Sequence, residues 1–322
     1  MKGSPTQFII RPFDRATDMP AFVRLRREVE EVDRSGNDVS EQAALSTLAW
    51  PGHDPARDRW TAWIEADPEN MAGYAFTWAQ SPERSIVYSA VRPDLRRRGI
   101  GSRLLEAVIM RSVEAGSTHA TSAVDASNET GGSFLSGRGF TPAGENRIMK
   151  AGADVDSPEP VWPAGYTARD FASVSDLHML AEALNGSYGD MWGHTENSPG
   201  IVDAGYLERE IETRPELHDP HGVFMVFGPE GDVAGVVAAF RRPAGPGREP
   251  DLVIDSPGVL PRHRSLGLQK QLTLTAMRWL RKGSTAPISL ETFGDSPEAF
   301  GIYAGLGFEI EARFIEYCRK LP

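Results

Sequence analysis

The sequence contains a repeat that is as long as a whole domain. Val91 and Val259 each open a segment in which a proline, an arginine and a glycine follow at the same spacing, so the two segments match at an offset of 168 residues. Gly139-Phe140 and Gly307-Phe308 match at the same offset. Such a unit is far longer than the repeats of solenoids, and a chain of 322 residues has room for two ordinary domains. The repeat therefore predicts two tandem copies of one fold.

Residues 151–165 separate the two copies. This stretch is rich in proline, glycine and acidic residues and has no periodic apolar pattern, which is typical of a linker. We therefore expect one domain over residues 1–150 and a second over residues 166–322. Strand-like and helix-like runs alternate in both, which predicts α/β domains, and an antiparallel hairpin in each makes the sheet mixed. The expected strands are 8–13, 60–65, 71–78, 85–91, 118–124, 166–171, 223–227, 233–240, 252–255, 288–293 and 308–317.

A basic loop with glycines joins a strand to a helix in the first copy. The apolar run 85–91 leads into Arg96, Arg97 and Arg98, and then into Gly99 and Gly101, where a helical run begins. Glycines let the backbone approach an anion closely, and the free N–H groups and the dipole of a helix start attract negative charge. The spacing is neither that of a dinucleotide fold nor that of a P-loop. The loop predicts a phosphate site; the alternative is a surface turn with solvated arginines.

Read as Arg96-x-x-Gly99-x-Gly101, this loop resembles the acetyl-CoA pyrophosphate loop of the GCN5-related N-acetyltransferases (GNAT). The tandem arrangement is similar to that of the mycothiol synthase type, from which we carry over the architecture and not the substrate. The resemblance implies two tandem acyl-CoA N-acyltransferase domains and acetyl-CoA as the acyl donor. The residues it places around the cofactor are Val91, Arg96, Arg97, Arg98, Gly99, Ile100, Gly101 and Ser102 in the first copy, and Val259, Arg264, Ser265, Leu266, Gly267, Leu268 and Gln269 in the second.

The two copies differ in the residues that the reaction would need. Acyl transfer from a thioester to an amine needs a base for the amine and an acid for the departing thiolate. In the family a tyrosine five residues before the Phe of the Gly-Phe turn often supplies that acid. This position is Tyr303 in the second copy and Leu135 in the first. The second loop, however, has Gln269 where a small residue is expected, and this side chain either crowds the pyrophosphate or rotates outward.

Candidates for the base and for the acceptor pocket come from the second copy. Asp255 ends the strand before the second loop and is the first candidate base, although an Asp there can also cap the Ser-Pro turn. Glu291, on the next strand, is the second candidate. The family builds its acceptor pocket near residues 185–197, where aromatic side chains with polar tips stand among glycines. The residues expected to contact substrate are Tyr188, Trp192 and His194, with Asp190 and Glu196 beside them; the alternative is a folded loop with Trp192 packed inward.

Composition narrows the remaining possibilities. A formal net charge of −11 argues against a nucleic-acid partner and weakly favours a cationic substrate. Cys318 is the single cysteine, and no apolar run approaches the ~20 residues that span a bilayer, so we expect a cytoplasmic protein with no membrane partner. His218-x-x-His221 has no matching cluster, and we predict a surface turn there and no metal. The sequence does not indicate an oligomeric state.

Together these features predict an N-acetyltransferase that acts on a small amine by direct attack. The better acid lies in the second copy and the better phosphate loop in the first, which suggests that the C-terminal domain is catalytic and that the N-terminal domain binds cofactor or supports the fold. Two alternatives remain: catalysis in the N-terminal copy, or a non-catalytic protein that binds or senses acyl-CoA.

Overall fold

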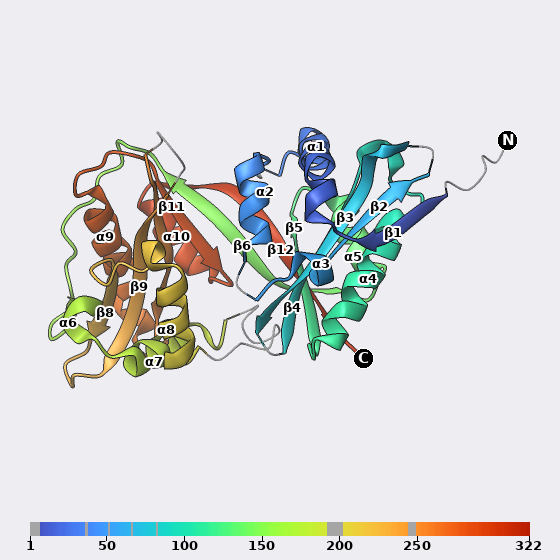
Figure 1. The fold of residues 1–322 in the computed structure, drawn as a ribbon. Helices are drawn as coiled ribbons and strands as arrows, with labels where there is room; N and C mark the ends of the chain where they lie inside the picture. Colours follow the sequence, from blue (N-terminus) through green and yellow to red (C-terminus); the bar gives the residue numbers. More distant parts are fainter. Residues whose placement is uncertain are drawn as a thin grey trace. The chain divides into compact units, whose positions relative to one another are not determined.

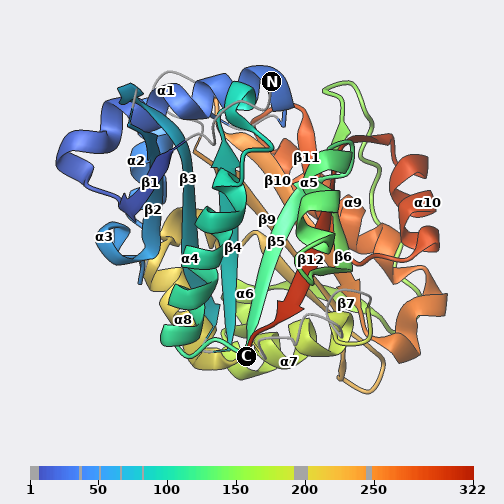
Figure 2. The same cartoon turned by 90° about the vertical axis from the view of Figure 1, so that its right-hand side faces the viewer.

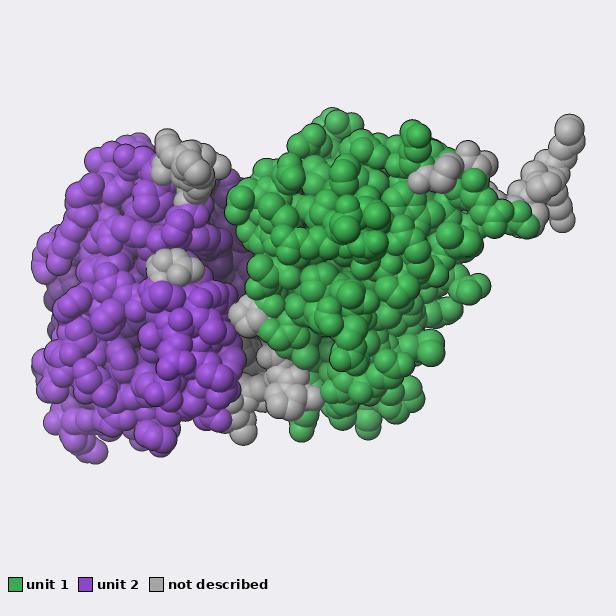
Figure 3. All heavy atoms as spheres, in the orientation of Figure 1, with its two compact units in different colours: residues 1–142, 317–322 green, residues 143–316 purple. Residues whose placement is uncertain are grey.

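The computed structural model describes residues 7–35, 38–50, 52–65, 67–81, 83–191, 202–243 and 249–322. Figure 1 shows the helices and strands along the chain, and Figure 2 shows them from a second side. The chain divides into two compact units, one of residues 1–142 and 317–322 and the other of residues 143–316 (Figure 3). No helix among the described residues is long and apolar enough to cross a membrane.

Unit 1 is a mixed sheet with helices on both faces. Its strand order is β1-β2-β3-β4-β5-β12, and β4 and β5 are parallel while β1 to β4 pair antiparallel. Helix α4 packs on one face of the sheet, and α1 and α2 pack on the other (Figure 2). The elements are β1 (Phe8–Pro12), α1 (Arg15–Asp33), α2 (Glu41–Leu48), α3 (Pro55–Asp58), β2 (Arg59–Ile64), β3 (Asp67–Ser81), β4 (Arg84–Val91), the 3-10 turn η1 (Pro93–Leu95), α4 (Ile100–Glu114), β5 (His119–Asp125) and α5 (Glu129–Ser136).

Unit 2 has the same plan. Its strand order is β12-β6-β11-β10-β9-β8-β7, with β10 and β11 parallel. Helices α9 and α10 cover one core, and α7 and α8 cover the other. The elements are β6 (Thr141–Ala151), β7 (Thr167–Asp170), α6 (Phe171–Val174), α7 (Leu177–Tyr188), α8 (Ala204–Thr213), η2 (Pro215–Leu217), β8 (Val223–Phe227), β9 (Val233–Arg242), β10 (Asp251–Val259), η3 (Pro261–Leu266), α9 (Leu268–Arg281), β11 (Ile288–Phe293), α10 (Pro297–Gly305) and β12 (Phe308–Lys320).

The two copies share a close contact between a glycine of one strand, the next strand and the helix after the loop. A Cβ added at Gly73 on β3 would lie 2.8 Å from the Ala90 carbonyl oxygen and 2.9 Å from Leu104 Cδ1. A Cβ added at Gly235 on β9 would lie 2.7 Å from the Gly258 carbonyl oxygen and 3.0 Å from the Cδ1 of Leu272. In each copy a strand glycine therefore lets the neighbouring strand and the helix after the loop approach closely. The predicted mixed α/β fold is confirmed.

The boundaries of the two compact units differ from the domain boundaries that the linker pattern predicts. Strand β6, which the sequence did not predict, pairs antiparallel with β11 from Asn146↔Phe293 to Ala151↔Ile288, so most of it lies in unit 2. The last six residues of the chain belong to unit 1, where the Leu321 N–H donates to the Thr118 carbonyl at 2.7 Å. The domain boundaries at residues 150 and 166 stay a prediction about the sequence repeat.

Residues 152–165 form neither helix nor strand, but they are held in place. The Arg278 guanidinium donates to the Ser157 carbonyl at 3.1 Å, and the Val161 N–H donates to Gln271 Oε1 at 2.8 Å. Val155 and Trp162 pack against the core of unit 2. The segment between the two copies is therefore hydrogen-bonded to α9 and packed against unit 2.

The close approach at Gly235 leads to a stability prediction. Gly235→Ala puts a methyl group against a backbone oxygen, which cannot move aside cheaply, and should lower the free energy of unfolding by about 1–3 kcal/mol. The control is Gly301→Ala in α10, where an added Cβ meets nothing within 4 Å; it should stabilise by about 0.5–1 kcal/mol. Urea unfolding of both variants measures the difference, and equal stabilities would contradict the packing at Gly235.

Candidate functional site

Both loops bring the start of a helix to the end of a strand without a capping side chain. Every other α-helix in the described part of the chain begins at an Asp, Ser or Asn whose side chain accepts from an N–H of the first turn. Helices α4 and α9 begin instead at Gly99 and Gly267, with φ of 88° and 71° and no side-chain cap. A Cβ at either glycine would meet nothing within 4 Å. The first-turn N–H groups of α4 and α9 therefore have no capping side chain as acceptor.

Two of the predicted loop arginines, Arg96 and Arg264, form ion pairs within the protein. Arg96 donates through Nε to the Val91 carbonyl at 3.1 Å and through both Nη atoms to Asp33 at 2.7 and 2.8 Å. Arg264 repeats this pattern with Val259 at 3.0 Å and with Asp190 at 2.7 and 2.8 Å. Each guanidinium is thus bound to a carboxylate at the end of α1 or just after α7. Both arginines thus connect the loops to neighbouring elements, and the cofactor roles predicted for them stay predictions.

The other predicted cofactor residues divide into exposed and buried ones. Arg97 and Arg98 are exposed, and Arg97 has a φ of 64°; in the second loop Ser265 and Leu266 are exposed as well. The side chains of Ile100 and Leu268 are buried in the cores, so only their backbones can face a ligand. Their cofactor roles stay predictions.

Sequence reasoning missed Arg138, which follows α5. Its guanidinium lies 3.8 Å from the centre of the Phe134 ring and donates to the Phe134 carbonyl at 2.8 Å and to the Ser102 hydroxyl. Ser102 lies in the first turn of α4, so Arg138 adds a cation beside the first loop. The feature of the sequence that could have indicated Arg138 is its position immediately before Gly139-Phe140.

In the second copy Gln269 neither rotates outward nor stays in the loop. Its Nε2 donates to the Tyr303 hydroxyl at 2.7 Å and to the Pro257 carbonyl at 2.9 Å. Tyr303 is 0% exposed, and its hydroxyl donates to Asp295 Oδ1 at 3.4 Å. The start of α9, strand β10 and helix α10 therefore meet at one buried phenol.

Strand β10 carries a β-bulge beside this phenol. Gly258 pairs with Val236 and Asp255 with Ala238, so two residues of β10 oppose the single residue between them on β9. Pairing with β11 ends at Asp255↔Glu291, so the two parallel strands pair only up to the bulge. Bulges are frequent next to active sites because they redirect side chains and end pairing. Here the bulge leaves Asp255 exposed.

Tyr188 lies against the same bulge. Its hydroxyl oxygen lies 2.9 Å from the position of a Cβ added at Gly258. Burial, and then the negative charges of Asp255 and Asp295, raise the pKa of Tyr188 well above its ordinary value. Tyr188 therefore stays protonated at neutral pH and can act as a donor. The structure thus brings together three of the predicted residues, Tyr188, Asp255 and Tyr303, around the bulge.

The remaining predicted residues do not join this group. Glu291 forms an ion pair with Arg242, which leaves it a weaker candidate for a base than Asp255. Trp192, His194 and Glu196 lie outside the described residues. At the expected surface turn, His221 is exposed and its Nδ1 lies 2.8 Å from Asp170 Oδ2, and no group of three metal-ligating side chains occurs in the described part of the chain.

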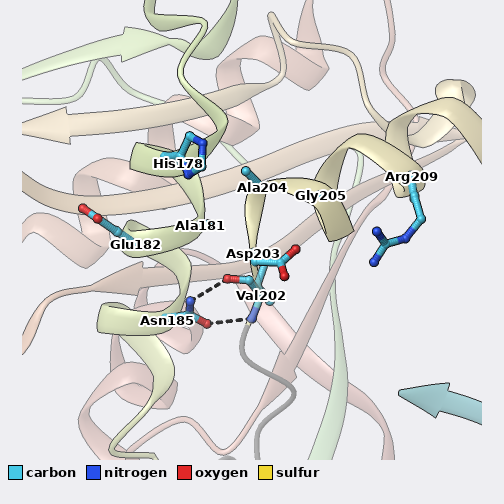
Figure 4. A pocket seen from close by; sticks show the side chains of 9 residues that line it. All are labelled: His178, Ala181, Glu182, Asn185, Val202, Asp203, Ala204, Gly205 and Arg209. Carbon is cyan, nitrogen blue, oxygen red and sulfur yellow. Dashed lines mark hydrogen bonds between the residues drawn. The ribbon is translucent and has the colours of Figure 1, made fainter. Parts of the chain in front are cut away.

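An open groove lies between α7 and α8, near the expected acceptor region (Figure 4). It encloses about 490 Å³ and is lined by both acidic and basic side chains, among them His178, Glu182 and Arg209. The amide of Asn185 is engaged with the backbone of Val202 at 2.7 and 3.1 Å, and Asp203 caps α8. The groove therefore offers side chains of both charges, while Asn185 and Asp203 are engaged with the backbone.

The first copy fills the corresponding face with aromatic rings. Its strands pair without a bulge at this point, and Tyr88 stands opposite Phe76, where the second copy has Asp255 opposite Ala238. The rings of Phe76 and Tyr88 stack at 5.4 Å, and Trp50 lies 5.3 Å from Phe76. Leu135, at the position that corresponds to Tyr303, is buried in the core and has no proton to donate.

A buried cation lies among these rings. Arg59 is 2% exposed, lies 4.9 Å from the centre of the Phe76 ring, and donates through Nε to His53 Nε2 at 2.9 Å. Burial, and then the charge of Arg59, lower the pKa of His53 to about 4. His53 is therefore a neutral acceptor for Arg59 in the folded protein.

Comparison with known proteins identifies the fold. The family model of the acetyltransferase (GNAT) family matches residues 22–140 and 178–308, once in each copy. The chain belongs to this family. It is 30% identical over 320 residues to a mycothiol acetyltransferase of Saccharomonospora viridis, covering 95% of both chains, and 28% identical over 264 residues to that of Rhodococcus erythropolis, covering 80% of this chain and 84% of the relative.

Solved structures share the tandem GNAT fold. A GCN5-related N-acetyltransferase from Sphaerobacter thermophilus matches with a TM-score of 0.75 and 20% identity, covering 98% of this chain and 96% of the other. A tandem GNAT protein from the clavulanic acid biosynthesis pathway matches with a TM-score of 0.66 and 15% identity over 98% and 99%. By its family and its relatives, the protein is an N-acetyltransferase of the tandem GNAT type.

The neutral His53 predicts a loss of stability in acid. The unfolded chain takes up a proton at His53 near pH 6.5, whereas the folded protein resists it down to about pH 4. Stability should therefore fall as the pH drops from 6.5 to 4, by about 3 kcal/mol from this residue. Denaturant unfolding at several pH values measures the slope. His53→Gln keeps an acceptor for Arg59 but does not titrate, and it should flatten the slope; an unchanged slope would refute the assignment.

Proposed function

We propose that this GNAT protein transfers an acetyl group from acetyl-CoA to a small amine, and that the second copy carries the chemistry. The observation that carries the proposal is the buried Tyr303, which meets Gln269 beside the bulge of β10. The first copy has Leu135 at that position and aromatic rings on that face, which speaks against catalysis there. Its role is to bind cofactor or to support the fold.

Both loops suit the diphosphate of acetyl-CoA. The uncapped first turns of α4 and α9 offer backbone donors, and Gly99 and Gly267 leave room in front of them. The exposed Arg97 and Arg98 add positive charge to the first loop, and Arg138 lies beside it. The residues expected to hold the diphosphate are thus the backbones of Ile100, Gly101 and Ser102, and of Leu268, Gln269 and Lys270.

The reaction is a direct attack. The amine nitrogen forms a bond to the thioester carbonyl carbon, the carbon–sulfur bond breaks, and the sulfur keeps the electron pair. Tyr303 gives its phenolic proton to that sulfur, and Asp255, exposed at the bulge, takes the proton that the amine loses. The products are an amide and a free thiol. Proton exchange with solvent then returns both side chains to their starting states.

The charges around the bulge favour a cationic acceptor. Asp255 and Asp295 lie near Tyr188 and raise its pKa, and the whole chain is acidic. An amine that arrives as an ammonium ion is attracted to such a site and must lose a proton before it attacks. Because the relatives are mycothiol acetyltransferases, the acceptor of those enzymes is the first amine to assay, beside amino sugars and simple amines.

The acid role of Tyr303 predicts a specific kinetic defect. Tyr303→Phe keeps the ring and its packing but removes the proton donor, so kcat should fall by roughly 10²-fold or more. KM for acetyl-CoA should change little, because the hydroxyl acts in the transition state. Thiol release from acetyl-CoA gives both constants, and a thermal melt checks folding. Tyr206→Phe, on the partly exposed face of α8, is the matched control and should behave as wild type.

The phosphate role of the first loop predicts a loss of binding. Gly101→Glu adds bulk and negative charge at the start of α4, where an added Cβ would lie 3.4 Å from Phe134, and should abolish CoA binding to the first copy. Calorimetric titration of the full chain with CoA should therefore show one binding event fewer. Met110→Glu places the same charge on an exposed position of α4 and should bind as wild type. Unchanged binding by Gly101→Glu would exclude this loop as a phosphate site.

A further inference from the structure

We propose that Gln269 is a positioning residue that directs the proton of Tyr303 toward the thioester sulfur. The inference rests on the proposed function, because it needs Tyr303 to be the acid. It assigns a role to the one loop residue that departs from the family pattern, and it explains why a side chain stands where the first copy has Gly101.

The orientation of the Gln269 amide follows from its neighbours. The Pro257 carbonyl can only accept a hydrogen bond, so the atom 2.9 Å from it must be the NH₂ group. The same NH₂ group lies 2.7 Å from the Tyr303 hydroxyl, which provides an acceptor for its second hydrogen. Asp295 Oδ1 lies at 3.5 Å, which is too long for a good hydrogen bond. Both hydrogens of the amide are therefore used, and one of them points at the phenol oxygen.

This contact determines the direction of the phenol proton. Because the Tyr303 oxygen accepts from Gln269, its own hydrogen must point elsewhere, and one acceptor in reach is Asp295 Oδ1 at 3.4 Å. A contact of that length is weak, so the proton can turn to a sulfur atom that arrives beside it. When Tyr303 has given up the proton, the Gln269 N–H group stabilises the negative oxygen that remains. The amide thus prepares the donor and supports the product of the transfer.

The two copies differ at both positions together. The second copy has Gln269 and Tyr303, and the first has Gly101 and Leu135, at the same offset. At Gly101 the space beyond the Cα is taken by Phe134, whose ring lies 3.4 Å from an added Cβ. The glutamine thus occurs in the copy that has a phenol to orient, and glycine occurs in the copy that has none.

The competing explanation is that Gln269 only narrows the phosphate site. The two explanations predict opposite kinetics for the same variants. A crowding side chain weakens acetyl-CoA binding, so its removal should lower KM and leave kcat unchanged. A positioning side chain acts in the transition state, so its removal should lower kcat and leave KM within about twofold.

The experiment is a double-mutant cycle in the full chain. Gln269→Leu, Gln269→Gly, Tyr303→Phe and the two double variants are assayed for thiol release from acetyl-CoA with the best amine of the panel. Each Gln269 variant should lower kcat by about 10- to 100-fold, the range for a hydrogen bond to a group that becomes charged. In the Tyr303→Phe background the same changes should cost nothing more, because the phenol through which Gln269 acts is gone.

Controls distinguish a failure of the positioning role from a failure of the proposed function. Gln271→Leu makes the same substitution two residues later on α9, where the side chain contacts Val161 instead, and should keep the wild-type kcat. Thermal melts of all variants exclude unfolding. If Tyr303→Phe lowers kcat but the Gln269 variants do not, or if their losses add fully to it, the positioning role is wrong and the proposed function stands. If Tyr303→Phe has no effect, or no amine gives enzyme-dependent thiol release, the proposed function itself fails.

Discussion

In each copy one arginine joins three parts of the fold, and the shape of the loop before the helix depends on this contact. Arg96 links the end of β4 to Asp33 at the end of α1, and Arg264 links the end of β10 to Asp190 just after α7. A bidentate arginine–carboxylate pair is geometrically demanding, so it holds the loop in one shape. The backbone donors at the helix starts can then face a ligand while the charge of the arginine is used internally.

The two copies share one backbone plan but differ in the side chains that occupy the corresponding face. In the second copy a bulge and the small Ala238 leave Asp255 exposed beside a buried phenol. In the first copy regular pairing places Tyr88 opposite Phe76, and rings with a buried Arg59 take up that face. Burying a cation is costly, and here aromatic faces and His53 offset the cost. The first copy therefore has a packed cluster of aromatic rings where the second has a bulge with an exposed carboxylate.

Gln269 is a residue at which the second loop departs from the sequence pattern of the first. At the start of a phosphate-binding helix a small residue avoids contact with the anion, so a glutamine at that position predicts impaired binding of the anion. Its side chain is long enough to leave the loop and reach Pro257 and Tyr303. The same residue therefore has its backbone at the start of α9 and its side-chain amide on the Tyr303 hydroxyl.

The sequence by itself determined the repeat, the mixed α/β fold, the family and the difference between Tyr303 and Leu135, because these depend on spacing along the chain. It did not predict β6, the bulge of β10 or the direction of Gln269. The partner of β6 is β11, more than a hundred residues away, and a bulge is defined only by the strand it pairs with. Likewise, the charge of Arg96 suggested a phosphate ligand, and only the tertiary structure placed Asp33 beside it. Local patterns specify elements, whereas contacts between distant residues decide which side chains are free to act.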